Sequence, residues 1–212
     1  MNHGSNQLTT DQMNGMGNTG MQHGNGMMDS TGTEQATGFL PAQGKNIDSL
    51  PEAKPSETID VKEGDIINLS PTIVRKMIHG KEMAMYGYNG EIPGPLLKVK
   101  QGSTFTVHVT NNIDLPTTIH WHGIRLDNAS DGTDGVTQKE IVPGGSFTYV
   151  VKVPDEGIYW YHTHVREDLQ QPLGLYGNIL VKSKDPKAYG KVNREEVLAA
   201  SDLLLDGNGL PV

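Results

Sequence analysis

The chain has 212 residues, a formal net charge of −8, an isoelectric point of about 5.4 and no cysteine. The acidic balance argues against a nucleic-acid-binding protein, which usually carries a basic patch. The lack of cysteine excludes disulfides, iron–sulfur clusters, thiolate zinc sites and a blue copper site within this chain. Any metal must therefore be held by histidine, carboxylate or methionine. The chain also has no run of about 18 apolar residues, the length needed to span a membrane.

Residues 1–56 differ in composition from the rest of the chain. The stretch "GMGNTGMQHGNGMMDSTGTEQATG" is rich in Gly, Asn, Thr and Met, and six of the nine methionines lie in the first 28 residues. Such a segment buries too little apolar surface to offset the entropy lost on ordering. We expect a disordered tail that is dispensable for folding. It is either a solvated linker or a weak Cu(I)-capture segment, because thioether sulfur is a soft ligand.

Residues 57–183 have the pattern of an all-β domain. Short strands are expected within residues 65–90, turning at His79-Gly80, within 103–113, within 145–164 and within 175–183. In "STFTVHVTNNI", Phe105, Val107 and Val109 alternate with polar residues, which is typical of a half-buried strand. Frequent Gly and Pro turns between short strands favour a sandwich or barrel. This first domain should close near Ser183.

Residues 184–212 are expected to form a linker followed by a new strand. The segment "EEVLAASDLLL", from Glu195 to Leu205, has the composition of a strand. One strand cannot form a domain. We therefore interpret this region as the beginning of a second, truncated domain.

Two tripeptides hold half of the eight histidines: His120 and His122 in "HWH", and His162 and His164 in "HTH". Residues i and i+2 of a strand project from the same face. Two such pairs on neighbouring strands would bring four imidazoles together, and neutral imidazole binds Zn, Cu, Fe and Ni. One H-x-H pair is a weak signal, but two in a single small β domain indicate a metal site.

The remaining histidines are not expected to join this site. His79 lies at the expected hairpin turn, and His108 lies on the polar face of an alternating strand. Both are expected to be structural or exposed. His3 and His23 belong to the tail.

These motifs, taken in order, resemble the first domain of a multicopper oxidase, the family of laccases, ascorbate oxidases and bacterial cuprous oxidases. The resemblance rests on "YNGEIPGPLLKVKQGSTFTVHVTNNI", "TTIHWHG", "DGTDGVTQKEIVPGGSFTYVVKV" and "GIYWYHTHVREDLQQPLGLYGNILVK". It covers about Thr58 to the end of the chain. It implies a cupredoxin-like Greek-key β-sandwich, which agrees with the expected strands.

The resemblance also implies roles for the paired histidines. His120 would bind the type 2 copper, and His122, His162 and His164 would bind the type 3 pair of a trinuclear cluster. The family supplies four further histidines and a cysteine-bound type 1 copper from its last domain. This chain has no His-Cys-His segment and no second set of ligands. By itself it is expected to be inactive.

An acidic residue is implied as a proton relay, because reducing oxygen to water consumes protons. Asp131 lies seven residues before Gln138, which is the commoner spacing in the family, and Asp134 lies four before it. Asp131 is favoured. The alternative is that Asp131 and Gly132 only form a turn, where Asp is often found.

The expected function is the N-terminal part of a copper-dependent oxidase that couples one-electron oxidation of a phenol or metal ion to reduction of O2 to water. Two alternatives stay open: a non-enzymatic copper-buffering module, and a two-domain protein that completes its cluster between subunits. The expected partners are O2, the electron donor and the remaining cupredoxin domains, with no nucleic acid. The expected location is periplasmic, cell-surface or extracellular, with a leader absent from this chain.

Overall fold

The computed structural model describes residues 41–211, and strands dominate this region. The strands are β1 (Thr58–Val61), β2 (Ile66–Asn68), β3 (Pro71–Ile78), β4 (Lys81–Tyr88), β5 (Leu96–Lys100), β6 (Thr104–Thr110), β7 (His120–His122), β8 (Ser146–Lys152), β9 (Gly157–His162) and β10 (Tyr176–Lys182). The helical elements are the short 3-10 helices η1 (Ile47–Ser49) and η2 (Asn128–Ser130) and one α-turn, α1 (Glu167–Gln170). None of these helices could cross a membrane.

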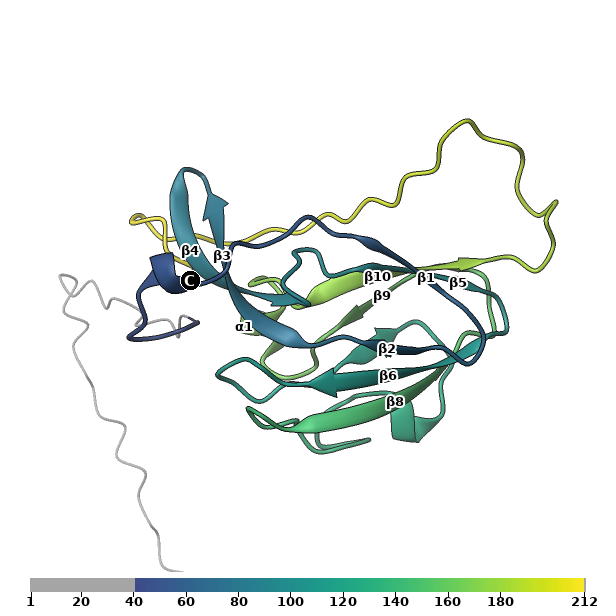
Figure 1. The fold of residues 1–212 in the computed structure, drawn as a ribbon, viewed down its shortest axis with the longest axis horizontal. Coiled ribbons are helices and arrows are strands. Elements are labelled where there is room, and N and C mark those ends of the chain that lie inside the picture. The colour runs from purple at the N-terminus through teal and green to yellow at the C-terminus, as the bar shows by residue number, and fades with distance from the viewer. Residues whose placement is uncertain (1–40, 212) are drawn as a thin grey trace, which may run out of the picture. The chain divides into compact units, whose positions relative to one another are not determined.

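Two sheets pack face to face around the main core (Figure 1). One sheet has the strand order β1-β5-β10-β9-β7, and the other has the order β2-β6-β8. Fully buried residues such as Leu97 of β5 and Val107 of β6 belong to the same apolar cluster, so both sheets contribute to one core. The strand β7, which carries the first histidine pair, is an edge strand of the larger sheet.

Strand β6 shows the predicted alternation. Phe105, Val107 and Val109 are buried, whereas His108 is exposed and its Nδ1 lies 2.8 Å from the Thr148 hydroxyl. The break between β8 and β9 at residues 153–156 and the closing strand β10 also confirm the sequence prediction. Apolar residues on every second position of β6 therefore identified the core-facing side.

The hairpin β3–β4 turns where the sequence predicted. His79 and Gly80 have φ values of 48° and 78°, and His79 is exposed. The two strands form a separate two-stranded sheet that is antiparallel over its whole length. Its apolar residues Val74, Met83 and Met85 form a second small core with Ile92.

The expected tail boundary at Ser56 is wrong for residues 41–56. The Ala42 N–H donates to Asp114 Oδ2 at 2.7 Å, and residues 51–54 form backbone hydrogen bonds with the β3–β4 region. Composition did not reveal this packing because backbone bonds and small side chains, among them Ala42 and Ala53, provide it. The expectation for residues 1–40 lies outside the described region.

The expected strand over Glu195–Leu205 is also wrong. Within the described residues, only Leu205 of this segment forms a β-bridge, and its partner is Pro211. Leu203 and Leu205 pack on the small core, but Leu198 and Leu204 are exposed. Apolar composition predicts where a strand can form, whereas a strand also needs a neighbouring edge with free N–H and C=O groups.

Candidate metal centre

The register of β7 against β9 brings the two histidine pairs together. His120 lies directly opposite His162, and His122 lies opposite Trp160. Because side chains alternate along a strand, these four rings share one face of the sheet. Trp121 projects from the other face into the main core, where it is fully buried. The core thus fixes the strand that presents the imidazoles.

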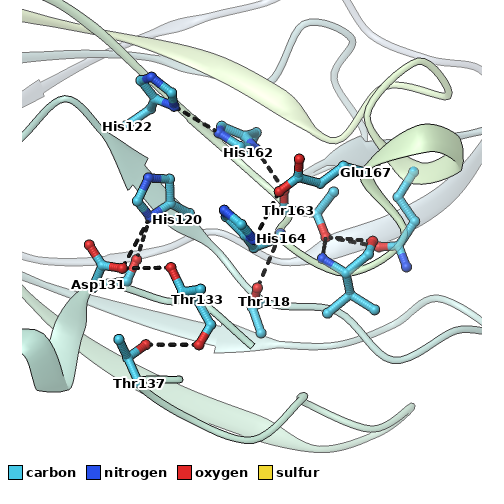
Figure 2. Close-up of polar contacts among 12 residues, drawn as sticks. Thr118, His120, His122, Asp131, Thr133, Thr137, His162, Thr163, His164 and Glu167 are labelled. Carbon is cyan, nitrogen blue, oxygen red and sulfur yellow. Dashed lines mark hydrogen bonds and ion pairs between the residues drawn. The ribbon is translucent and has the colours of Figure 1, made fainter. Parts of the chain in front are cut away.

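Three imidazoles converge on a common space (Figure 2). His120, His122 and His162 each offer a ring nitrogen, and these three atoms lie within 4.8 Å of one another. The ring centroids are 5.4–5.6 Å apart. His122 Nδ1 lies 3.3 Å from His162 Nε2, so these two nitrogens face each other. These two residues could therefore hold the same ion.

His164 lies beside this group, but its backbone is not in a strand as predicted. The strand β9 ends at His162, so His164 is not on a strand face. Its backbone N–H donates to the Thr118 hydroxyl at 3.2 Å. Its ring lies 5.1 Å from that of His120 and 5.9 Å from that of His162, centroid to centroid. The sequence therefore predicted that His164 lies near the other histidines, but it did not predict the backbone conformation of this residue.

Backbone carbonyls fix the tautomer of two cluster histidines. His120 Nδ1 lies 2.8 Å from the Asp131 carbonyl oxygen, and His162 Nδ1 lies 2.6 Å from the Thr163 carbonyl oxygen. A carbonyl can only accept, so each Nδ1 carries the proton and each Nε2 keeps its lone pair. Hydrogen bonds of this kind commonly orient metal-binding histidines. His122 differs, since its Nδ1 faces the cluster.

Burial keeps His162 neutral. The pKa of its imidazole is lowered to about 4, mainly by desolvation and also by the nearby histidines, while the carbonyl of Thr163 opposes the shift. The imidazole is therefore unprotonated near neutral pH, which is the form that binds metals. Trp160 stacks on His162 with ring centroids 4.0 Å apart and shields one side of that ring.

Asp131 and Asp134 lie in different surroundings. Asp131 Oδ2 is 3.5 Å from His120 Nδ1 and accepts a 2.6 Å hydrogen bond from the Thr133 hydroxyl. Asp134 instead forms a β-bridge with Gln138, and the described contacts include none between its carboxylate and a cluster histidine. The favoured residue, Asp131, is thus the one that reaches the cluster, while its role as a proton relay remains a prediction.

The sequence did not predict a buried polar network that lies next to the cluster and includes Thr163, the residue between His162 and His164. The Thr163 hydroxyl lies 3.0 Å from the Thr117 hydroxyl and 3.1 Å from Gln170 Oε1, and Gln170 Nε2 donates to the Pro116 carbonyl at 2.9 Å. Thr117, Thr163 and Gln170 are fully buried. The network ties α1 and the turn after β9 to the loop before β7. Single Thr and Gln residues carry no sequence signal that separates them from surface positions.

The donor set fits a copper ion. All the converging groups are imidazoles, which in their neutral form suit Cu as well as Zn, Fe and Ni. Each of the three has a nitrogen directed at the shared space, and two are fixed by bonds at the opposite nitrogen. The geometry alone does not select copper among these metals.

Comparison with known proteins favours copper among these metals. The family model described as multicopper oxidase matches residues 71–186. Copper resistance protein A of Pseudomonas syringae pv. tomato is 37% identical over 150 residues, which cover 71% of this chain and 24% of that protein. Multicopper oxidase MmcO of Mycobacterium tuberculosis is 41% identical over 134 residues, which cover 63% of this chain and 26% of that protein.

A solved structure shows the same similarity. Blue copper oxidase from Nitrosomonas europaea matches with a TM-score of 0.57 and 38% identity, covering 58% of this chain and 40% of that one. The expected cupredoxin-like sandwich is thus confirmed. The matches span about a quarter of the length of these two curated relatives. The family model covers more than half of the chain, which therefore belongs to the multicopper oxidase family.

Proposed function

We propose that this domain supplies four histidine ligands to the trinuclear copper centre of an oxidase. The observation that carries the proposal is the convergence of three imidazole nitrogens within 4.8 Å. In this proposal His120 binds the type 2 copper, and His122, His162 and His164 bind the type 3 pair. His122 Nδ1 and His162 Nε2 face each other at 3.3 Å, which supports the assignment of both residues to the type 3 pair.

The proposed reaction couples four one-electron oxidations of a donor, a phenol or a reduced metal ion, to O2 + 4 H⁺ + 4 e⁻ → 2 H2O. Bound copper would supply the one-electron redox chemistry. Because the 212 residues include no cysteine, the proposal requires a type 1 copper bound elsewhere in the same protein or in another subunit, which would also supply the other histidines. In this proposal the domain contributes the position of four imidazoles and, through backbone carbonyls, the tautomer of His120 and His162.

Asp131 is proposed to deliver protons to the reaction. Its carboxylate is about one-third exposed and lies 3.5 Å from His120 Nδ1, so it can exchange protons with solvent beside the cluster. The Thr133 hydroxyl holds one of its oxygens in place. The backbone carbonyl of Asp131 separately fixes His120, so one residue would serve both orientation and proton transfer.

Copper titration of paired variants tests the proposal. Replacing His162 and His164 by Ala should abolish the tightest Cu(II) binding seen by isothermal titration calorimetry. The matched control replaces the two exposed histidines, His79 and His108, and should leave that binding unchanged. Every variant keeps the same N-terminal residues, so any binding there cancels. Equal affinities in the two double variants would contradict the proposal.

A further inference from the structure

The Nδ1 atom of His164 faces a carboxylate, whereas the Nδ1 atoms of His120 and His162 face backbone carbonyls. Glu167 Oε1 lies 2.9 Å from His164 Nδ1, which is within ion-pair distance, although the contact does not have hydrogen-bond geometry and Oε1 is buried without another hydrogen-bond partner among the described residues (Figure 2). Glu167 is the first residue of α1, three positions after His164, and both side chains are partly buried. No other acidic group is paired with this ring among the described ion pairs and hydrogen bonds. The second ring nitrogen, Nε2, carries no such partner.

The surrounding structure determines the position of Glu167. Arg166 turns the chain in the left-handed region, with φ 45° and ψ 56°, immediately before α1. At the other end of α1, Gln170 is fully buried and bonded to both Thr163 and the Pro116 carbonyl. Arg166 is paired with Asp168, so it does not compete for Glu167. The end of the turn is thus anchored to the rest of the domain by Gln170, and the conformation of Arg166 sets the direction in which the turn starts.

We propose that Glu167 is a positioning residue that makes His164 a ligand through its Nε2 atom. A carboxylate is an acceptor, so it draws the imidazole proton to Nδ1 and leaves the Nε2 lone pair free. Carboxylate–histidine pairs of this kind orient metal ligands and raise their basicity. His120 and His162 receive the same tautomer from backbone carbonyls, which no substitution can remove, whereas His164 depends on a side chain. The copper part of this inference rests on the proposed function; the tautomer part does not.

Nitrogen NMR of the metal-free chain tests the tautomer directly. Long-range ¹H–¹⁵N correlations at about pH 8, where imidazole is neutral, should show His164 protonated at Nδ1. Glu167→Ala should shift it toward the Nε2–H tautomer. Glu167→Gln should keep the Nδ1–H form, because the amide oxygen still accepts. Asp168→Asn, in the same turn but paired only with Arg166, is the matched control and should leave the tautomer unchanged.

Cu(II) titration of the same variants tests the consequence. Glu167→Ala should weaken Cu(II) binding by about 10- to 100-fold, Glu167→Gln should weaken it less, and Asp168→Asn should match the wild type. Circular dichroism would confirm that all variants fold. If Glu167→Ala leaves both the tautomer and the Cu(II) affinity at control values, the inference is wrong. If the wild type binds no Cu(II) at its histidines, the proposed function fails, while the tautomer shift still decides the role of Glu167.

Discussion

At the scale of single residues, the cluster depends on a close approach at Gly132. This glycine is buried and has φ 81°, a conformation that side chains other than glycine rarely adopt. A Cβ atom at this position would overlap the carbonyl oxygen of Ile119 and lie 3.1 Å from the backbone nitrogen of His120. The missing side chain lets the Asp131 carbonyl reach His120 Nδ1.

Gly132→Ala should therefore damage both stability and metal binding. We expect the free energy of unfolding to fall by about 2 kcal/mol or more, because a strained backbone and an overlap are combined. The Cu(II) affinity should fall as well, since His120 loses its orienting partner. Gly135→Ala is the matched control: its φ is 68°, but nothing lies within 4 Å of the added Cβ. Urea unfolding that shows equal losses in both variants would rule out the close approach.

The sequence predicted the clustered histidines at this scale but not the residues that contact them. His120, His122 and His162 follow from strand alternation, which is local. Gly132, Thr133 and Glu167 act through loops and turns whose paths are set by packing elsewhere in the domain. The contact between His120 and the Asp131 carbonyl spans 11 positions along the chain, and no sequence period encodes it.

At the scale of elements, the hairpin β3–β4 is held by segments from both ends of the described chain. It forms no ladder with either larger sheet. On one side, the Ala53 N–H donates to the Arg75 carbonyl and the Arg75 N–H donates to the Pro51 carbonyl, both at 2.8 Å. On the other, Leu203 and Leu205 pack on its apolar side chains. The hairpin is therefore stabilised by segments that carry no strand of their own.

A chain that begins at residue 57 should be less stable than one that begins at residue 41. The shorter chain loses the bond from Ala42 to Asp114 and the backbone bonds of residues 51–54. At about 1 kcal/mol for each hydrogen bond, the loss is about 3–5 kcal/mol, which corresponds to a midpoint lower by roughly 6–20 °C. Thermal unfolding followed by circular dichroism measures it. Midpoints within about 2 °C of each other would show that residues 41–56 are dispensable, as their composition first indicated.

The sequence predicted the strands and turns that are determined by local residue patterns. It did not predict the segments whose conformation depends on packing against other parts of the domain. The alternation of β6 and the turn at His79-Gly80 are local, and both were predicted. The packing of residues 41–56 and the largely non-strand path of Glu195–Leu205 depend on which strand edges are open to them. That information lies in the tertiary structure.

At the scale of the whole molecule, the cluster lies at the edge of the sandwich rather than inside it. Its strand β7 is the last in its sheet. His162 is buried, His120 and His164 are partly buried, and His122 is exposed. The domain shields His162 and leaves His122 open to solvent, as the proposed sharing of the centre with residues from outside this domain requires.

The 212-residue chain loaded with copper should therefore be a copper protein without oxidase activity. Four imidazoles can hold one or two ions at low coordination number, but not three together with an electron-entry site. A blue copper site needs a thiolate, and this chain has no cysteine. We expect no intense blue absorption and no oxygen uptake that depends on a phenolic donor, with the copper-free chain as the control in the oxygen electrode. Donor-dependent reduction of oxygen to water by this chain alone would mean that its own residues complete the centre, and the assignment of only half of the ligands to it would be wrong.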